Sequence, residues 1–91
     1  MRVLIAVPDL LARSRIEAAA RAAGHEVAPG SRVPAPSEPA PDLLVADLDA
    51  PAALERLEEW RAAHPDGPVT GFAFHVNEQV IERARALGVR V

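Results

Sequence analysis

The middle of the sequence contains the stretch Pro41-Asp42-Leu43-Leu44-Val45-Ala46-Asp47, an apolar run with an aspartate on each side. A short, continuous apolar run between turn-forming residues is typical of a strand that is buried on both faces of a parallel sheet. A second run of this kind, Val3 to Val7, lies near the start of the chain. The two runs together predict that the fold is built on a parallel sheet.

Signals for helices follow these strands. Asp9 is suited to cap a helix over 10–23 that ends at Gly24, and Pro51 is suited to the first turn of a helix that reaches Ala63. Asn77 is a good cap for a third helix over 78–87. In the first helix we expect one inward stripe and a separate row of charged residues. The stripe is Ala12, Ile16, Ala19, Ala20 and Ala23, and the row is Arg13, Glu17 and Arg21.

The remaining strands are predicted over 25–28 and 69–74, and residues 89–91 can only begin a fifth strand, a stub. Between the strand at 25–28 and the apolar run that ends at Asp47, residues 29–41 include five prolines, a density that no helix tolerates. We expect an extended connection that crosses the sheet where a helix would usually lie. Alternating strands and helices imply a parallel sheet. The predicted fold is therefore α/β and flavodoxin-like, with strand order 2-1-3-4-5. Its second helix is replaced by the proline-rich loop, and its last helix is missing.

Size and composition narrow the class of protein. The 91 residues are enough for one small core, so we expect a single domain over 1–91, either complete or truncated at its C-terminal end. The chain has no cysteine, no apolar run long enough to cross a membrane, and no signal-peptide pattern. Its net charge is −3 and its arginines are scattered. We therefore expect a cytoplasmic protein that binds neither nucleic acid nor a membrane.

The stretch 41–47 resembles the receiver domain of bacterial response regulators, in which a Pro-Asp pair precedes an apolar strand whose last aspartate accepts a phosphoryl group. The resemblance continues in an apolar strand that starts at residue 3, in Pro68-Val69 and in the run from Ala84 to Val89. It implies a receiver-like fold with Asp47 at the position of the phosphoacceptor. Gly71, Phe72 and His75 are also similar to a run in small receiver-like proteins of unassigned function.

The chain departs from the family at the other catalytic positions. Val7 and Pro8 stand where the family has the acidic pair that holds Mg²⁺, Ala73 stands where it has a hydroxyl, and the chain contains no lysine. Phosphorylation needs a bridging cation and positive charge near the phosphoryl oxygens. We therefore expect a non-catalytic pseudo-receiver, not an enzyme. It would act in signalling or protein interaction. We expect it to need no cofactor, because the sequence gives only weak support for bound Mg²⁺.

A second hypothesis is a small metal- or ligand-binding domain, or an enzyme, that uses the cleft at the strand ends. Ligands of open α/β sheets bind beyond the carboxyl ends of the strands. The residues expected there are Asp9, Asp47, Asp49, Ala73 and His75. If a metal is bound, Asp9, Asp47 and His75 are its candidate ligands. The competing interpretation is that Asp9 and Asp49 cap helices and that Asp47 accepts hydrogen bonds from neighbouring amides.

The missing last helix also predicts an assembly. Without it, only the alanine-rich first helix covers one face of the sheet. At about 25 cal/mol per Å², even ~400 Å² of exposed apolar surface is worth about 10 kcal/mol before the costs of association. We expect a homodimer, or binding to a protein partner, with residues 77–87, Val89-Arg90-Val91 and the neighbouring face at the interface. The alternative is that a continuation of the chain supplies the helix.

Overall fold

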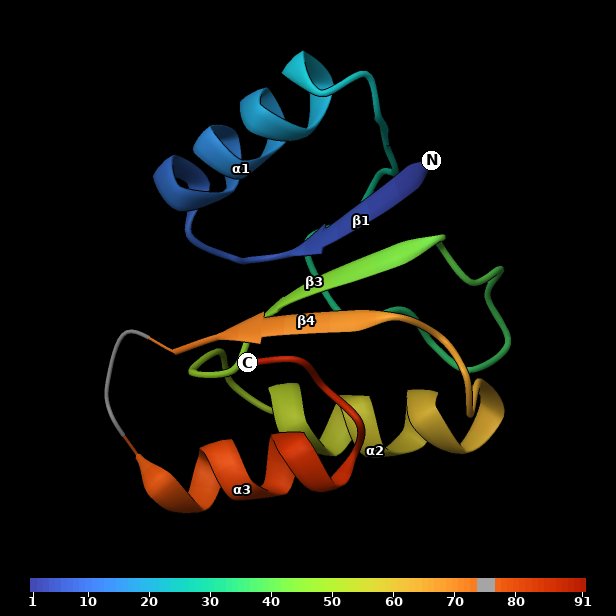
Figure 1. Ribbon diagram of the computed structural model, residues 1–91, viewed down its shortest axis with the longest axis vertical. Helices are drawn as coiled ribbons and strands as arrows, with labels where there is room; N and C mark the ends of the chain where they lie inside the picture. Colours follow the sequence, from blue (N-terminus) through green and yellow to red (C-terminus); the bar gives the residue numbers. More distant parts are fainter. Residues whose placement is uncertain (74–76) are drawn as a thin grey trace.

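The computed structural model describes residues 1–73 and 77–91. The order of elements is strand, helix, strand, strand, helix, strand, helix (Figure 1). Their bounds are β1 Arg2–Ala6, α1 Leu10–Ala22, β2 Glu26–Val27, β3 Leu43–Asp47, α2 Ala53–Ala63, β4 Val69–Phe72 and α3 Glu78–Ala86. Among the described residues, no helix is long and apolar enough to span a membrane.

The strands form one parallel sheet with the order β2-β1-β3-β4. The two predicted apolar runs are its inner strands, with Val3 paired to Leu43 and Ala6 to Ala46. The expectation of five strands was wrong. Where the fifth was predicted, only Arg90 forms a parallel bridge, to Thr70 of β4. Gly88, at φ +76°, turns the chain back beside β4, and the pairing stops after this single bridge.

The sheet separates two layers, with α1 on one side and α2 and α3 on the other (Figure 1). On one face, α2, α3 and the proline-rich loop enclose a cluster that includes Leu44, Leu57, Trp60 and Val69. On the other face, α1 packs over β1 and β2, and the fully buried residues are Val3, Ile5 and Val7. Most of the hydrophobic core therefore lies on the α2 side of the sheet.

The proline-rich loop replaces a helix, as predicted. No helix lies between β2 and β3. Within the loop, Val33 is 5% exposed and packs into the same cluster as Leu4 and Leu44, and Pro34 is also buried. An extended segment with no helix has no apolar stripe, so it covers the sheet with a few side chains only.

Arg61 holds the ends of α2 and α3 together. Its Nε donates a hydrogen bond to the carbonyl oxygen of Leu87 at 2.7 Å. One of its terminal nitrogens donates to the carbonyl oxygens of His64, Pro65 and Gly67 at 2.8–3.0 Å. These carbonyls belong to helix ends and a turn, where backbone acceptors lack partners within a helix. The Arg61 guanidinium therefore supplies hydrogen-bond donors to carbonyl oxygens of the turn and of the two helix ends.

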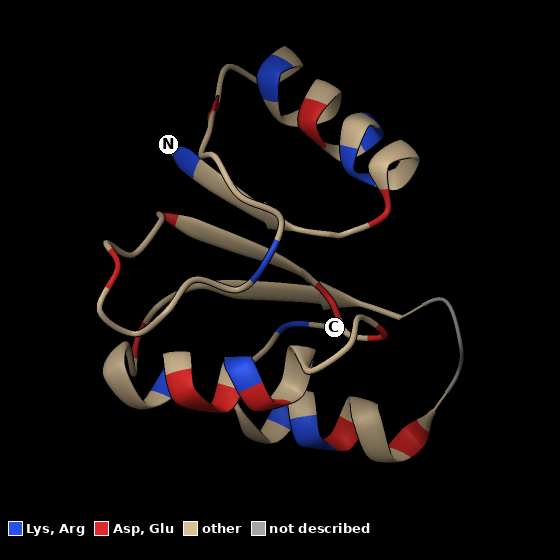
Figure 2. Ribbon diagram, turned by 180° about the vertical axis from the view of Figure 1, so that it is seen from behind, with Lys and Arg blue, Asp and Glu red and all other residues tan. Residues whose placement is uncertain are grey.

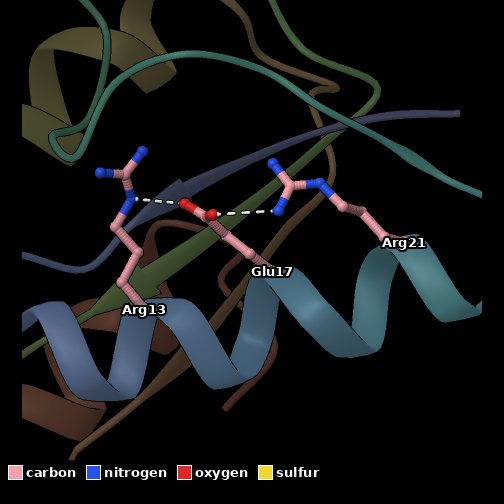
Figure 3. A network of polar contacts seen from close by, with 3 residues as sticks. All are labelled: Arg13, Glu17 and Arg21. Atoms are coloured by element: carbon pink, nitrogen blue, oxygen red, sulfur yellow. Dashed lines mark hydrogen bonds and ion pairs between the residues drawn. The ribbon is translucent and has the colours of Figure 1, made fainter.

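Helix α1 packs on the sheet through residues that are at most half-buried. Ala12, Ile16 and Ala20 form its sheet-facing stripe, whereas Ala19 and Ala23, which were expected there, are exposed. Arg13 and Glu17 are half-buried beside this stripe, contrary to the expected separate row. Glu17 contacts Arg13 at 2.9 Å and Arg21 at 3.4 Å (Figure 3). Arg13 and Glu17 therefore form their ion pair on a partly buried part of the helix surface.

Candidate functional site

Three parallel strands end at the same edge of the sheet, where the candidate residues were expected. Asp47 ends β3 beside Phe72, the last residue of β4, and Ala46 pairs with Ala6, the last residue of β1. The segments that follow these strands bring Asp9, Asp49 and Ala73 to this edge. His75 lies outside the described residues.

Asp47 is the one buried acidic residue among the described residues, with 8% of its surface exposed. Its Oδ1 accepts a hydrogen bond from the backbone N–H of Asp49 at 2.9 Å. Its carbonyl oxygen accepts another from the N–H of Ala50 at 3.2 Å. Aspartate commonly forms such bonds with the backbone two residues ahead, and they stabilise turns. The Asp47 side chain therefore holds the turn that leads from β3 to α2.

Asp9 caps α1, as the sequence predicts. Its Oδ1 accepts a hydrogen bond from the backbone N–H of Ala12 at 2.9 Å. Asp49 is exposed, and its backbone N–H is the donor to Asp47. Ala73 is half-buried and packs against the cluster on the α2 side of the sheet. Two of the candidate carboxylates, those of Asp9 and Asp47, thus have a local backbone partner.

A metal site is not formed by the described residues alone. Within residues 1–73 and 77–91, no three aspartate, glutamate or histidine side chains lie close enough together to hold an ion. The proposed ligand set Asp9, Asp47 and His75 includes a residue outside this range. Both the metal site and the use of Mg²⁺ remain predictions.

A pocket that the sequence did not reveal lies at the same edge on the α2 side. Its volume is about 360 Å³, and it is lined by the ends of β1, the proline-rich loop and the first turn of α2. Ser31 and Arg32 come from the loop, and Arg56 comes from α2. Arg32 and Arg56 are 24 positions apart in a chain whose arginines follow no pattern, so only the fold brings them together.

The α1 side of the sheet is incompletely covered over β3 and β4. Leu43 and Val45 of β3 and Thr70 and Phe72 of β4 are half-buried, whereas Val3 and Ile5 of β1 and Val7 just after it are buried. Helix α1 packs over β1 and β2, and no other described helix lies on this face (Figure 1). We call Leu43, Val45, Thr70 and Phe72 the open face. Helix α3 lies on the opposite side of the sheet, so the predicted interface that combined residues 77–87 with this face was wrong in that respect.

Comparison with known proteins supports the fold only. No protein-family model matches the chain, and no curated protein does. A similar solved structure is a fusion that contains residues 181–211 of the yeast Spc42 trimeric coiled coil joined to another protein. The match has a TM-score of 0.77 at 16% identity and covers 99% of this chain and 65% of that one. At this identity the likeness establishes a shared α/β architecture without a shared activity.

Proposed function

We propose that the protein is a non-catalytic, receiver-like interaction module that associates with a second copy of itself through the open face. The observation that carries this proposal is the unequal covering of the sheet. The α2 side is enclosed by two helices and a loop, whereas β3 and β4 have half-buried side chains on the α1 side. Signalling would then depend on the state of assembly instead of on turnover.

The composition of the open face favours a second copy as its occupant. Leu43, Val45, Thr70 and Phe72 carry no charge, and in Figure 2 the charged residues of the strands stand only at strand ends. A two-fold interface brings the same patch of each copy together. Each copy would bring four uncharged side chains to this interface, with Arg90, which bridges Thr70, as a charged neighbour at the edge of β4.

The chemistry at the strand ends supports the absence of catalysis. Asp47 stands alone at the position of the receiver phosphoacceptor, with Val7, Pro8 and Ala73 at the other matching positions. Its Oδ1 already accepts the Asp49 N–H. Phosphoryl transfer to an aspartate needs a cation that neutralises the carboxylate and the phosphoryl oxygens. A single carboxylate held by its own turn is poorly suited to bind that cation.

The phosphorylation test is incubation with acetyl phosphate and Mg²⁺, followed by intact mass measurement. We expect no phosphoryl adduct on the wild-type chain. An adduct that forms on the wild type and is lost in Asp47→Asn would overturn the non-catalytic assignment. Asp9→Asn is the control, because this carboxylate lies at the same edge and caps α1.

The association test is sedimentation velocity from micromolar to submillimolar concentration. We expect the wild type to sediment as a dimer and Leu43→Glu to sediment as a 9.7 kDa monomer, because an added charge on each copy opposes pairing. Leu11→Glu is the matched control, since Leu11 is 65% exposed on α1, outside the open face. Circular dichroism melting verifies that both variants fold. A wild type that stays monomeric throughout, with cooperative melting, would contradict self-association.

A further inference from the structure

The pocket between the proline-rich loop and α2 has a chemistry that neither the fold nor the open face explains. Its ten lining residues include two arginines and one serine, and no aspartate or glutamate is among them. The others are alanine, proline and valine side chains at the end of β1, in the loop and in the turn before α2. A site with two cations and apolar walls is unusual in a chain that carries 13 acidic residues and ten basic ones.

Arg32 and Arg56 differ from the arginines that stabilise the fold. Arg61 donates to four backbone carbonyls, and Arg83 donates to Glu58 across α2 and α3 at 2.6 Å, which raises the pKa of Arg83. Within the described part of the chain, the side chains of Arg32 and Arg56 have neither a hydrogen bond nor an ion pair. Their guanidinium groups are therefore available to a ligand.

The surroundings of the two arginines also favour an anion. Ala52 and Ala53 place the amino end of α2 at the pocket, and α2 has no side-chain cap at Ala52. The helix dipole makes this end weakly positive. Glu38 lines the adjoining hollow of about 320 Å³ together with both arginines, but it does not line the pocket itself. Glu55, the acidic residue of the first turn of α2, lies outside both hollows.

We propose that this pocket binds a small organic phosphate, a phosphate monoester dianion. Arg32 and Arg56 would clamp the phosphate from two different elements, with the Ser31 hydroxyl as a further donor, and two permanent charges would match the dianion. The alanine, proline and valine walls would hold the organic part. The volume of about 360 Å³ is at the lower end of the range for small-molecule pockets. Binding at this site is independent of the open face, which lies on the other side of the sheet.

The experiment is a titration of the ¹⁵N-labelled protein with phenyl phosphate at constant ionic strength, followed by amide chemical shifts. We expect saturable shifts at the amides of Ser31, Arg32, Ala52 and Ala53. Arg32→Gln and Arg56→Gln should each weaken binding by about tenfold or more, because each removes a charge-assisted contact. Arg15→Gln is the matched control, since Arg15 is an exposed arginine of α1 on the other side of the sheet, and it should bind like the wild type.

Inorganic phosphate and benzoate serve as comparison probes. We expect both to bind more weakly than phenyl phosphate, the first because it lacks an organic part and the second because it carries one charge. Equal affinity in wild type, Arg32→Gln and Arg56→Gln would overturn the site. Benzoate that binds as tightly as phenyl phosphate would overturn the choice of a phosphate. Melting curves of the variants in phosphate-free buffer verify that both exposed arginines can be replaced without unfolding.

Discussion

The two faces of the sheet are built by opposite means. On the α2 side, thirteen buried residues form one continuous cluster, and α2 alone contributes Leu54, Leu57 and Trp60 to it. On the α1 side, the fully buried residues are Val3 and Ile5 of β1 and Val7 just after it, and α1 contributes no buried side chain. The same sheet therefore has one face held by packing and one face that packing covers only in part.

The helices show the same contrast at their ends. Helix α1, with no buried residue, has a side-chain cap at Asp9, an ion pair within the helix and a glycine just beyond its end, Gly24, at φ +85°. Helix α2, with four buried residues, is preceded by Ala52 in a left-handed conformation and has no side-chain cap. Local interactions stabilise the loosely packed helix, and tertiary packing stabilises the poorly capped one.

The largest expected effect is a difference in stability between substitutions on the two faces of the sheet. Leu57 of α2 is 1% exposed, so Leu57→Ala should lower the free energy of unfolding by about 2–5 kcal/mol. Ile16→Ala on α1 removes a half-buried side chain of similar size, and we expect a loss of about 1–2 kcal/mol. Urea unfolding of both variants at equal protein concentration measures the difference. Equal losses would mean that the α1 side is packed as tightly as the α2 side.

The next effect concerns the turn that closes the α2 side. A Cβ at Gly67 would clash with the indole Cη2 of Trp60 and lie 3.0 Å from its Cζ3. Trp60 is 1% exposed and cannot move aside, so Gly67→Ala should destabilise the protein by about 1–3 kcal/mol. In a Trp60→Leu background the same change should cost much less, because the clashing ring is gone. A double-mutant cycle by thermal melting measures this coupling, and additive losses would exclude the clash.

Much of the fold could be predicted from the sequence. The strands over 2–6 and 43–47 follow from continuous apolar runs, and the caps at Asp9 and Asn77 follow from their side chains, because these signals are local. The parallel order of the four strands follows from the alternation of elements. In place of a fifth strand the structure has a single bridge, in which Arg90 exchanges backbone hydrogen bonds with Val69 and Gly71 of β4.

The parts that could not be predicted depend on distant residues. The pocket joins Arg32 and Arg56 through the path of a loop that has no regular structure. The burial of Arg13 and Glu17 depends on how closely an alanine-rich helix approaches the sheet, which the helical pattern alone does not determine. For Asp47 the sequence allowed two roles, a ligand-binding carboxylate or a carboxylate that stabilises a turn. The structure adds the hydrogen bond from the Asp49 N–H.

The smallest effects test the contrast at the helix starts, and they have opposite signs. Asp9→Ala removes the hydrogen bond to the Ala12 N–H and should cost about 1 kcal/mol. Ala52 has φ +60°, where the Cβ of an L-residue costs about 1–2 kcal/mol, whereas glycine adopts this conformation freely. Because glycine also makes the unfolded chain more flexible, Ala52→Gly should raise stability by only about 0.5 kcal/mol.

Both changes are measured by urea unfolding in phosphate-free buffer, because Ala52 lines the pocket proposed to bind phosphate. Ala53→Gly is the matched control for the second change. Ala53 is the first residue of α2 and is 6% exposed, so the same substitution there removes a buried methyl group and should destabilise the protein. If Ala52→Gly were as destabilising as Ala53→Gly, the start of α2 would not be strained. Helix α2 would then need no packing to offset it.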